Sequence, residues 1–216
     1  MGHLSTWLAF DASGDTSSVA LWVDGLCTIE RSPKEKSRSD VLLPMMQTVL
    51  RQQNIELTGV DAIAYAHGPG SFTGLRLAAS IAKSVAYALK KPLYSVSSLA
   101  LAAYRFYQDN PEVSQAVTVA IDAKMDEYYL GCYQREHTGV SAIIDDVLCD
   151  QAQLATKQLS ESVLITHSEA DAIDVIKLCR CGWGAEQNPL DAGVAYVRGQ
   201  DAWKTTAQQV NEQKTF

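Results

Sequence analysis

The chain has 216 residues, 47% of them hydrophobic and 20% charged, which is the composition of an ordinary globular protein. Its 18 basic and 25 acidic residues give a formal net charge of -7, which disfavours independent binding to a nucleic-acid backbone. No apolar run approaches the ~20 residues of a membrane span, and the N-terminus lacks the pattern of an export signal. We therefore expect a cytoplasmic protein with no membrane partner.

The first half of the sequence alternates strand-like and helix-like patterns. Periodicity predicts strands at residues 7–10, 19–22 and 26–31, a helix at 40–53, a strand at 62–67, a helix at 73–90, a strand at 92–96 and a helix at 98–107. This alternation predicts an α/β protein in which helices cover a mixed sheet, with ligands at the carboxyl ends of the strands.

The join between one buried strand pattern and a long helix pattern contains three glycines. It covers residues 67–76 (HGPGSFTGLR), and its glycines are Gly68, Gly70 and Gly74. Glycine permits positive φ and close backbone approach, while the first turn of the helix leaves N–H groups unpaired at the positive end of the helix dipole. The join therefore predicts a binding site for a phosphate or a carboxylate.

This join differs from the GxxxxGK[ST] phosphate loop, because Leu75 and Arg76 stand where that loop has its lysine and its hydroxyl residue. Ser71 and Thr73 lie at the start of the predicted helix and complete the candidate anion site. The alternative is a tight strand-to-helix turn that Thr73 caps and that binds no ligand.

Two short stretches repeat one pattern about half the chain apart. Residues 9–15 (AFDASGD) and 120–126 (AIDAKMD) both contain an apolar residue, Asp, Ala and a second Asp four positions after the first. Each stretch lies between two strand patterns, so each predicts a hairpin with an acidic turn. The repeat indicates a duplication, with one subdomain at residues 1–108 and a smaller, less regular one at 109–216.

The first aspartate of each repeat, Asp11 and Asp122, follows a strand pattern, and we expect both to face one cleft. Paired carboxylates in a cleft could hold a hydrated magnesium ion beside a nucleotide phosphate. The alternative is that each aspartate accepts hydrogen bonds from the backbone of its own turn.

With the repeat and the glycine join established, the sequence resembles the TsaB (also called YeaZ) family of the actin-like ATPase superfamily. The most specific stretch is residues 64–76 (AYAHGPGSFTGLR), supported by residues 8–12 (LAFDA), 120–123 (AIDA) and 92–99 (PLYSVSSL). The resemblance covers nearly the whole chain. It implies a duplicated actin-like (ribonuclease-H-like) fold, in which two mixed β-sheet halves covered by helices surround a cleft.

The resemblance also implies a function. Members of the family are partners of the related catalytic subunit TsaD in the formation of threonylcarbamoyladenosine in tRNA, with TsaE as an accessory ATPase and TsaC as the source of the activated precursor. We therefore expect a homodimer when the protein is alone, and contact with tRNA only through the complex.

The catalytic relative carries a His-x-x-x-His metal pair after the strand that follows the glycine-join helix. In this sequence Ser98 and Ala102 stand at the two positions, and neither side chain can replace an imidazole nitrogen as a metal ligand. The five cysteines lack CxxC spacing and partner histidines, so a zinc site is not expected either. The resemblance therefore implies a non-catalytic subunit without a metal.

The second half continues with a strand pattern at residues 142–148 and a helix pattern at 169–178. Members of the family that the sequence resembles carry a glycine-containing strand and turn in this half, and residues 151–165 contain no such pattern. Either this chain has lost the element, or a loop is omitted from the sequence near residues 159–163. We therefore expect no tightly bound cofactor, and ATP or ADP with Mg²⁺ only at the partner interface. The glycine join and the two aspartates would then form a vestigial anion or nucleotide cleft.

The helices around residues 40–50 and 75–89 form a bundle with the partner in the family that the sequence resembles. Methionine gives an adaptable apolar surface, which suits a contact used for both self-association and partner binding. The predicted partner-binding residues are Leu42, Met45, Met46, Val49, Leu50, Leu75 and Ala78. The alternative is that these are ordinary core residues of the chain itself.

Two other functions remain open from the residues alone. The acidic hairpins would also suit an ATP-dependent phosphotransferase or ATPase, although no acceptor-activating carboxylate base can be assigned. A metallopeptidase is a third alternative, and it lacks both the metal pair and an HExxH helix.

Overall fold

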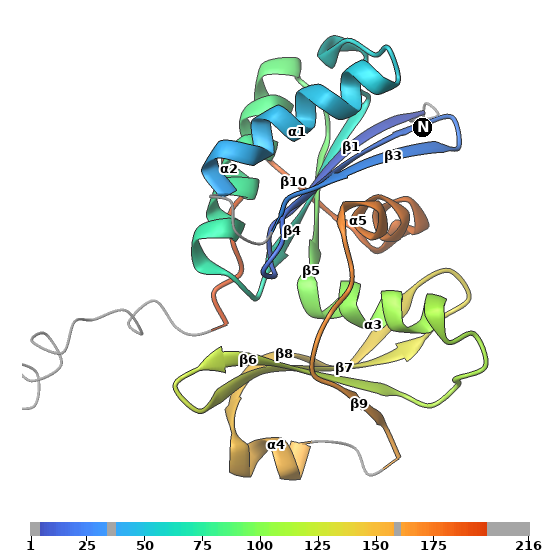
Figure 1. Ribbon diagram of the computed structural model, residues 1–216. Coiled ribbons are helices and arrows are strands. Elements are labelled where there is room, and N and C mark those ends of the chain that lie inside the picture. The colour runs from blue at the N-terminus through green and yellow to red at the C-terminus, as the bar shows by residue number, and fades with distance from the viewer. Residues whose placement is uncertain (1–4, 34–37, 158–160, 198–216) are drawn as a thin grey trace, which may run out of the picture.

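The computed structural model describes residues 5–33, 38–157 and 161–197, which form two β-sheets with helices on their faces (Figure 1). The first sheet has the strand order β10-β5-β4-β1-β2-β3. Its strands are β1 (Thr6–Asp11), β2 (Ser18–Val23), β3 (Leu26–Arg31), β4 (Ala62–Gly68), β5 (Leu93–Ser97) and β10 (Ala185–Gln187). Strands β1, β4 and β5 run parallel, whereas β2, β3 and β10 pair antiparallel with their neighbours.

The second sheet has the strand order β8-β7-β6-β9. Its strands are β6 (Val117–Lys124), β7 (Glu127–Arg135), β8 (Val140–Asp150) and β9 (Val163–Ile165). Strands β6, β7 and β8 form an antiparallel meander, and β9 pairs parallel with β6.

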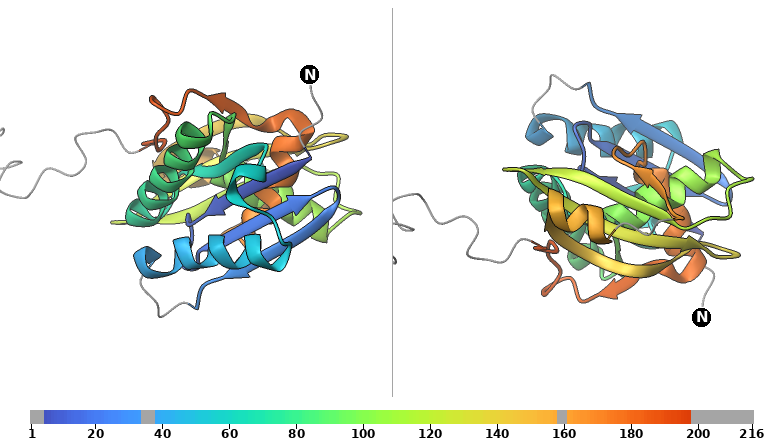
Figure 2. Two further views of the ribbon diagram at one scale, coloured as in Figure 1. Left: turned by 90° about the horizontal axis from the view of Figure 1, so that it is seen from above. Right: turned by 90° about the horizontal axis from the view of Figure 1, so that it is seen from below.

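The helices lie in three layers around the two sheets. They are α1 (Arg38–Gln52), α2 (Phe72–Leu89), α3 (Ser98–Asp109), α4 (Gln151–Lys157) and α5 (Ala172–Leu178), with short helical turns at Leu57–Gly59 and Cys179–Trp183. Helices α1 and α2 cover the outer face of the first sheet, α3 and α5 lie between the sheets, and α4 covers the outer face of the second sheet (Figures 1 and 2). None of the helices in the described part of the chain is long and apolar enough to cross a membrane.

Strand β1 shows how one strand serves two cores. Leu8 and Phe10 belong to the apolar cluster beneath α1 and α2, whereas Trp7 and Ala9 belong to the cluster around α3 and α5. Successive side chains of a strand point to opposite faces, so a strand buried on both faces needs a continuous apolar run instead of an alternating one. This requirement explains the uninterrupted pattern of residues 7–10.

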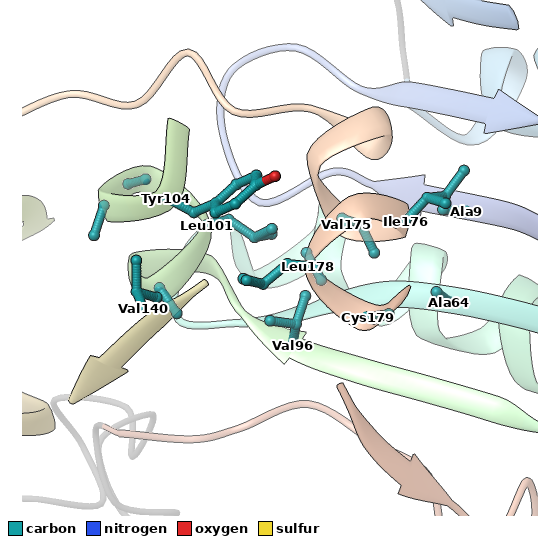
Figure 3. Packing of buried hydrophobic residues seen from close by; sticks show 14 of the residues in the cluster. Ala9, Ala64, Val96, Leu101, Tyr104, Val140, Val175, Ile176, Leu178 and Cys179 are labelled. Carbon is teal, nitrogen blue, oxygen red and sulfur yellow. The ribbon is translucent and has the colours of Figure 1, made fainter. Parts of the chain in front are cut away.

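The central core joins the two sheets through α5. In Figure 3, Ile176 of α5 lies beside Ala9 of β1, while Leu178 lies toward Leu101 of α3 and Val96 of β5. Alanines on this face of the first sheet leave room for the helix to approach closely. The N-terminus of α5 carries a capping box formed by Asp171 and Asp174, and its Ala172 N–H donates to Ser18 Oγ at 2.9 Å.

The structure confirms the predicted fold of two mixed sheets covered by helices, and the eight elements predicted in the first half all form. The predicted boundary between residues 108 and 109 falls at the end of α3, before the chain enters the second sheet at β6, and the division into two subdomains stays a prediction. The last part of the chain then returns to the first sheet, because β10 pairs with β5 and α5 packs on β1 and β2. Three short elements, α4, β9 and β10, were not predicted.

Candidate functional site

The glycine join packs against the turn between β1 and β2. The Ser71 N–H donates to the Ser13 carbonyl oxygen at 2.8 Å, and a Cβ placed on Gly70 would lie 2.4 Å from that same oxygen. Gly70 also has a φ of 154°. Glycine is therefore required here for a close approach between two segments of this chain.

The other face of the join is covered by the segment after β10. A Cβ on Gly68 would lie 2.9 Å from Leu75 Cδ1 and 3.4 Å from the Ala195 carbonyl oxygen. The Ala195 N–H donates to the His67 carbonyl oxygen at 2.9 Å, and the Tyr65 hydroxyl donates to the Gly193 carbonyl oxygen at 2.7 Å. Both sides of the join are thus engaged by the protein itself.

At the start of α2 the predicted residues lie as follows. Ser71 occupies the N-cap position without a side-chain capping hydrogen bond, Thr73 is exposed in the first turn, and Gly74 is buried. The helix therefore begins two residues earlier than a Thr73 cap would place it. Anion binding at this helix start stays a prediction, with the N–H of Ser71 already used by Ser13.

The two acidic turns use their first aspartate in the same way. Asp11 Oδ1 accepts the Ser13 N–H at 2.9 Å, and Asp122 Oδ1 accepts the Lys124 N–H at 2.7 Å. Each carboxylate thus bonds to the backbone two residues further on, as in an Asx turn. This is the alternative that the sequence left open for both residues.

The environments of the two aspartates differ. Asp11 is 6% exposed, and burial raises the pKa of its carboxyl. The Asp122 side chain is 60% exposed, and its ion pair with Lys124 Nζ at 2.8 Å lowers its pKa. The Asp15 carboxylate in turn helps to raise the pKa of Lys124, so the tips of the two hairpins lie within electrostatic range of each other.

A cavity of about 490 Å³ lies where the carboxyl ends of β4 and β5 meet β7 and β8. Its polar and aromatic lining residues are His67, Ser97, Tyr133, Asp145, Asp146, Trp183 and Tyr196. Neither Asp11 nor Asp122 is among the residues that line it. The predicted aspartates and this cavity are therefore different places in the fold.

Asp146 is the centre of the hydrogen bonds in the cavity. Ser97 Oγ donates to Asp146 Oδ2 at 2.5 Å, and the Tyr133 hydroxyl donates to Asp146 Oδ1. Ser97 is also the N-cap of α3, where its Oγ accepts the N–H groups of Leu99 at 3.1 Å and Ala100 at 3.2 Å. The carboxylate is thereby linked through one hydroxyl to the positive end of a helix dipole.

Two of the ionisable groups that line the cavity, Asp146 and His67, are largely shielded from water, whereas Asp145 is exposed. Burial raises the pKa of Asp146, and the neighbouring Asp145 adds to the rise. Burial also lowers the pKa of His67 to about 4, so this imidazole is neutral near pH 7. The buried His67 Nδ1 has no hydrogen-bond partner among the described residues.

The residues at the predicted metal positions lie in the first turns of α3. Ser98 and Ala102 are 8% and 2% exposed, and the Ser98 hydroxyl has no hydrogen-bond partner within the described ranges. Among residues 5–33, 38–157 and 161–197, no group of three or more His, Cys, Asp and Glu side chains could hold a metal ion. Sequence residues 158–160, which interrupt the region between α4 and β9, lie outside the described residues.

The structure places the predicted partner-binding side chains in the core. These residues are Leu42, Met45, Met46, Val49, Leu50, Leu75 and Ala78, and each is 8% exposed or less. The apolar stripe of an amphipathic helix packs on its own sheet, which is the core alternative that the sequence left open. The seven predicted residues therefore form no surface on this chain. They lie on the inward faces of α1 and α2, which pack on the first sheet.

The outward face of the same two helices carries other apolar residues. Leu43 of α1 is 47% exposed, and Tyr87 of α2 is 63% exposed. Leu77 and Ile81 of α2 are partly buried. The spacing of these residues from the buried residues of the same helix is the sequence signal that would have distinguished the outward face from the inward face.

Sequence comparison identifies relatives of the chain. Residues 32–189 match the TsaD family model, described as tRNA N6-adenosine threonylcarbamoyltransferase. The tRNA threonylcarbamoyladenosine biosynthesis protein TsaB of Escherichia coli is 38% identical over 62% of this chain and 57% of its own length. TsaB of Haemophilus influenzae is 37% identical over 61% of this chain and 55% of its own length. The chain thus spans little more than half the length of these relatives.

Structure comparison gives the same relationship. YeaZ from Pseudomonas aeruginosa matches with a TM-score of 0.77 and 29% identity, covering 89% of this chain and 99% of the solved one. An uncharacterized P. aeruginosa protein with similarity to peptidase YEAZ matches with a TM-score of 0.79 and 29% identity, covering 90% of this chain and 100% of the solved one. The two mixed sheets with their covering helices therefore define an actin-like fold.

Within that class, the chain belongs to the TsaD family of actin-like proteins, in the group named TsaB or YeaZ.

Proposed function

We propose that this chain is a non-catalytic partner of a TsaD-type subunit in the formation of threonylcarbamoyladenosine in tRNA. The observation that carries the proposal is the start of α3, where Ser98 and Ala102 stand at the positions that the family resemblance assigns to the catalytic relative's two histidines. Both side chains are buried in the core of this chain. The names of the sequence relatives supply the reaction to which such a partner would belong.

The acidic turns support the absence of catalysis. Asp11 and Asp122 both bond to the backbone of their own turns, and neither lines the cavity between the sheets. A phosphoryl-transfer site needs a carboxylate free to position a metal ion or an attacking hydroxyl. Under this proposal any ATP or ADP with Mg²⁺ binds at the partner interface and not within this chain.

The outward face of α1 and α2 is the partner surface in this proposal. Leu43, Pro44 and Gln47 are exposed on α1, and the two helices lie together on the outer face of the first sheet (Figure 2). An exposed leucine beside a second helix suits burial in a helical bundle. The same surface would form a homodimer when the chain is alone. TsaE and TsaC are the further partners in this proposal, and tRNA is contacted only through the complex.

Reconstitution tests this function. A TsaD-type subunit, TsaE and TsaC are combined with tRNA, threonine, bicarbonate and ATP, with and without this chain. We expect threonylcarbamoyladenosine only when the chain is present. Equal formation without it would contradict the proposal, and metal-dependent formation by this chain without the TsaD-type subunit would show that it is itself the enzyme.

A further inference from the structure

The cavity between the sheets has the size and position of a small-molecule site. Its volume of about 490 Å³ falls within the several hundred cubic ångströms usual for ligand pockets. Both halves of the chain line it, with His67 and Ser97 from the first sheet and Tyr133 and Asp146 from the second. A ligand here would contact both halves at once.

The inner wall carries negative charge without a basic counterpart. Asp145 and Asp146 both line the cavity, and no lysine or arginine is among the described lining residues. Hydroxyl groups of Ser97 and Tyr133 donate to Asp146, yet a carboxylate can accept about four hydrogen bonds. Acceptor positions on this carboxylate are therefore left for a donor from a ligand.

Two glycines make room for the polar and aromatic parts of this wall. A Cβ on Gly131 of β7 would lie 2.8 Å from Asp146 Oδ1 and 2.9 Å from the Tyr133 hydroxyl oxygen. A Cβ on Gly139 would lie 2.2 Å from Trp183 Nε1. The carboxylate and the indole ring occupy space that any other residue in these two positions would fill.

From this geometry we propose that the cavity binds a small organic cation, whose ammonium or amidinium N–H groups donate to Asp146 while its apolar body contacts Trp183 and Tyr196. Hydrogen bonds to a charged partner are stronger than neutral ones, and aromatic faces attract cations. A phosphate group would meet two carboxylates, and no described lysine or arginine lines the cavity, although Arg76 Nε donates to the hydroxyl of the lining Tyr196 at 2.8 Å. The proposal goes beyond the proposed function and does not depend on it.

A matched ligand series tests the charge requirement on the full chain alone, without partner or tRNA. Benzamidine, benzamide and benzoate share an aromatic ring and carry a positive, zero and negative charge. We expect benzamidine to bind with a Kd of about 1 mM or tighter by calorimetry, benzamide to bind at least about tenfold more weakly, and benzoate not to bind. The chemical shift of the Trp183 indole N–H should move with benzamidine, move only at higher concentrations of benzamide, and stay unchanged with benzoate.

Variants test the position of the site. Asp146→Asn should weaken benzamidine binding roughly 10- to 100-fold, because it removes a hydrogen bond between charged groups. The exposed Asp145→Asn should fold normally and weaken binding by about two- to fivefold through the loss of a nearby charge. Asp122→Asn is the matched control outside the cavity and should bind benzamidine as the unmodified chain does.

Four outcomes would overturn the proposal. They are no benzamidine binding by the folded chain, equal binding of benzoate, displacement of benzamidine by MgATP at comparable concentration, and unchanged affinity in both Asp145→Asn and folded Asp146→Asn. If the Asp146→Asn variant does not fold, the benzamidine affinity of Asp145→Asn and the chemical shift of the Trp183 indole N–H decide whether benzamidine binds in the cavity. A failure of the cation-binding proposal would not change the result of the tRNA modification assay, so this proposal and the proposed function can be contradicted independently.

Discussion

The glycine join and the cavity between the sheets both lie at the carboxyl ends of strands, and they differ in what fills them. At the join, Ser13 and Ala195 bond to the backbone on either side, and the close approach leaves no space for a side chain at Gly70. In the cavity, Asp146 and His67 retain polar atoms that the described chain does not pair fully. A glycine motif can thus serve internal packing, while the open polar site comes from residues far apart in sequence.

The largest effect should separate the two faces of α1. Met46→Lys places a charge in the core beneath the helix and should lower the free energy of unfolding by about 3 to 5 kcal/mol. Leu43→Lys, on the outward face, should change stability by less than about 0.5 kcal/mol and weaken association with the TsaD-type subunit. Urea unfolding and a binding titration measure the two effects. If the Met46→Lys variant is as stable as the unmodified chain but no longer binds the TsaD-type subunit, Met46 belongs to the partner surface after all.

The second largest effect should come from the glycine join. Gly70→Ala places a methyl group 2.4 Å from the Ser13 carbonyl oxygen and should cost about 2 to 3 kcal/mol of unfolding free energy. Gly14→Ala, in the adjoining turn, meets no atom within 4 Å and is the matched control. If both variants unfold at the same urea concentration as the unmodified chain, the packing role assigned to the join is wrong.

The helix that joins the two halves should make stability depend on pH. Burial raises the pKa of Asp174 to about 6, and the Asp171 carboxylate adds to the rise, while Arg105 and Lys177 oppose it. The folded state therefore holds this proton more tightly than the unfolded state, so the contribution is present below the unfolded pKa and is lost as the pH rises through about 6. We expect a loss of about 2 kcal/mol between about pH 4 and pH 7.

Asp174→Asn removes the titrating group and keeps the size of the side chain. The change in unfolding free energy between about pH 4 and pH 7, measured by urea unfolding, should therefore be smaller in the variant by about 2 kcal/mol. An unchanged profile in the variant would assign the dependence to other groups.

The smallest effect should distinguish the cavity from the join. Gly131→Ala places a methyl group against the ends of two side chains, which can shift more readily than backbone, so we expect a loss of about 1 kcal/mol. Because Asp146 and Tyr133 must move, benzamidine binding should weaken more than stability does. Gly59→Ala, whose Cβ would meet only Ile55 Cγ2 at 3.5 Å, is the control for both measurements. Loss of stability with unchanged binding would mean that Gly131 does not shape the cavity.

Most of the fold was predictable because the first half carries clear periodic patterns. Strands buried on both faces and helices with one apolar stripe give strong local signals, and the repeat around Asp11 and Asp122 indicated the second hairpin correctly. The short elements α4 and β10 carry little periodicity, and the pairing of β10 with β5 is a long-range contact. A local pattern contains no information about such a pairing.

The site was less predictable. The pattern identified the residues of the join and both aspartates, and the structure gives them turn and packing contacts. Ser97, Tyr133 and Asp146 come from separate elements, and only the packing of β7 and β8 against the start of α3 brings them together. Gly131, which pairs with Val119 of β6 and lies where the β7–β8 register shifts, was the one local signal of that crowding.

The central proposal is that this chain acts as a stoichiometric partner and not as an enzyme. Its most direct test is a titration of the chain into a fixed amount of TsaD-type subunit, with threonylcarbamoyladenosine in tRNA measured at each step. We predict that product formation rises to a plateau at a fixed ratio of the two subunits, and that Leu43→Lys shifts the rise to higher concentration. Product formation independent of the chain, or proportional to it without a plateau and without the TsaD-type subunit, would contradict the claim.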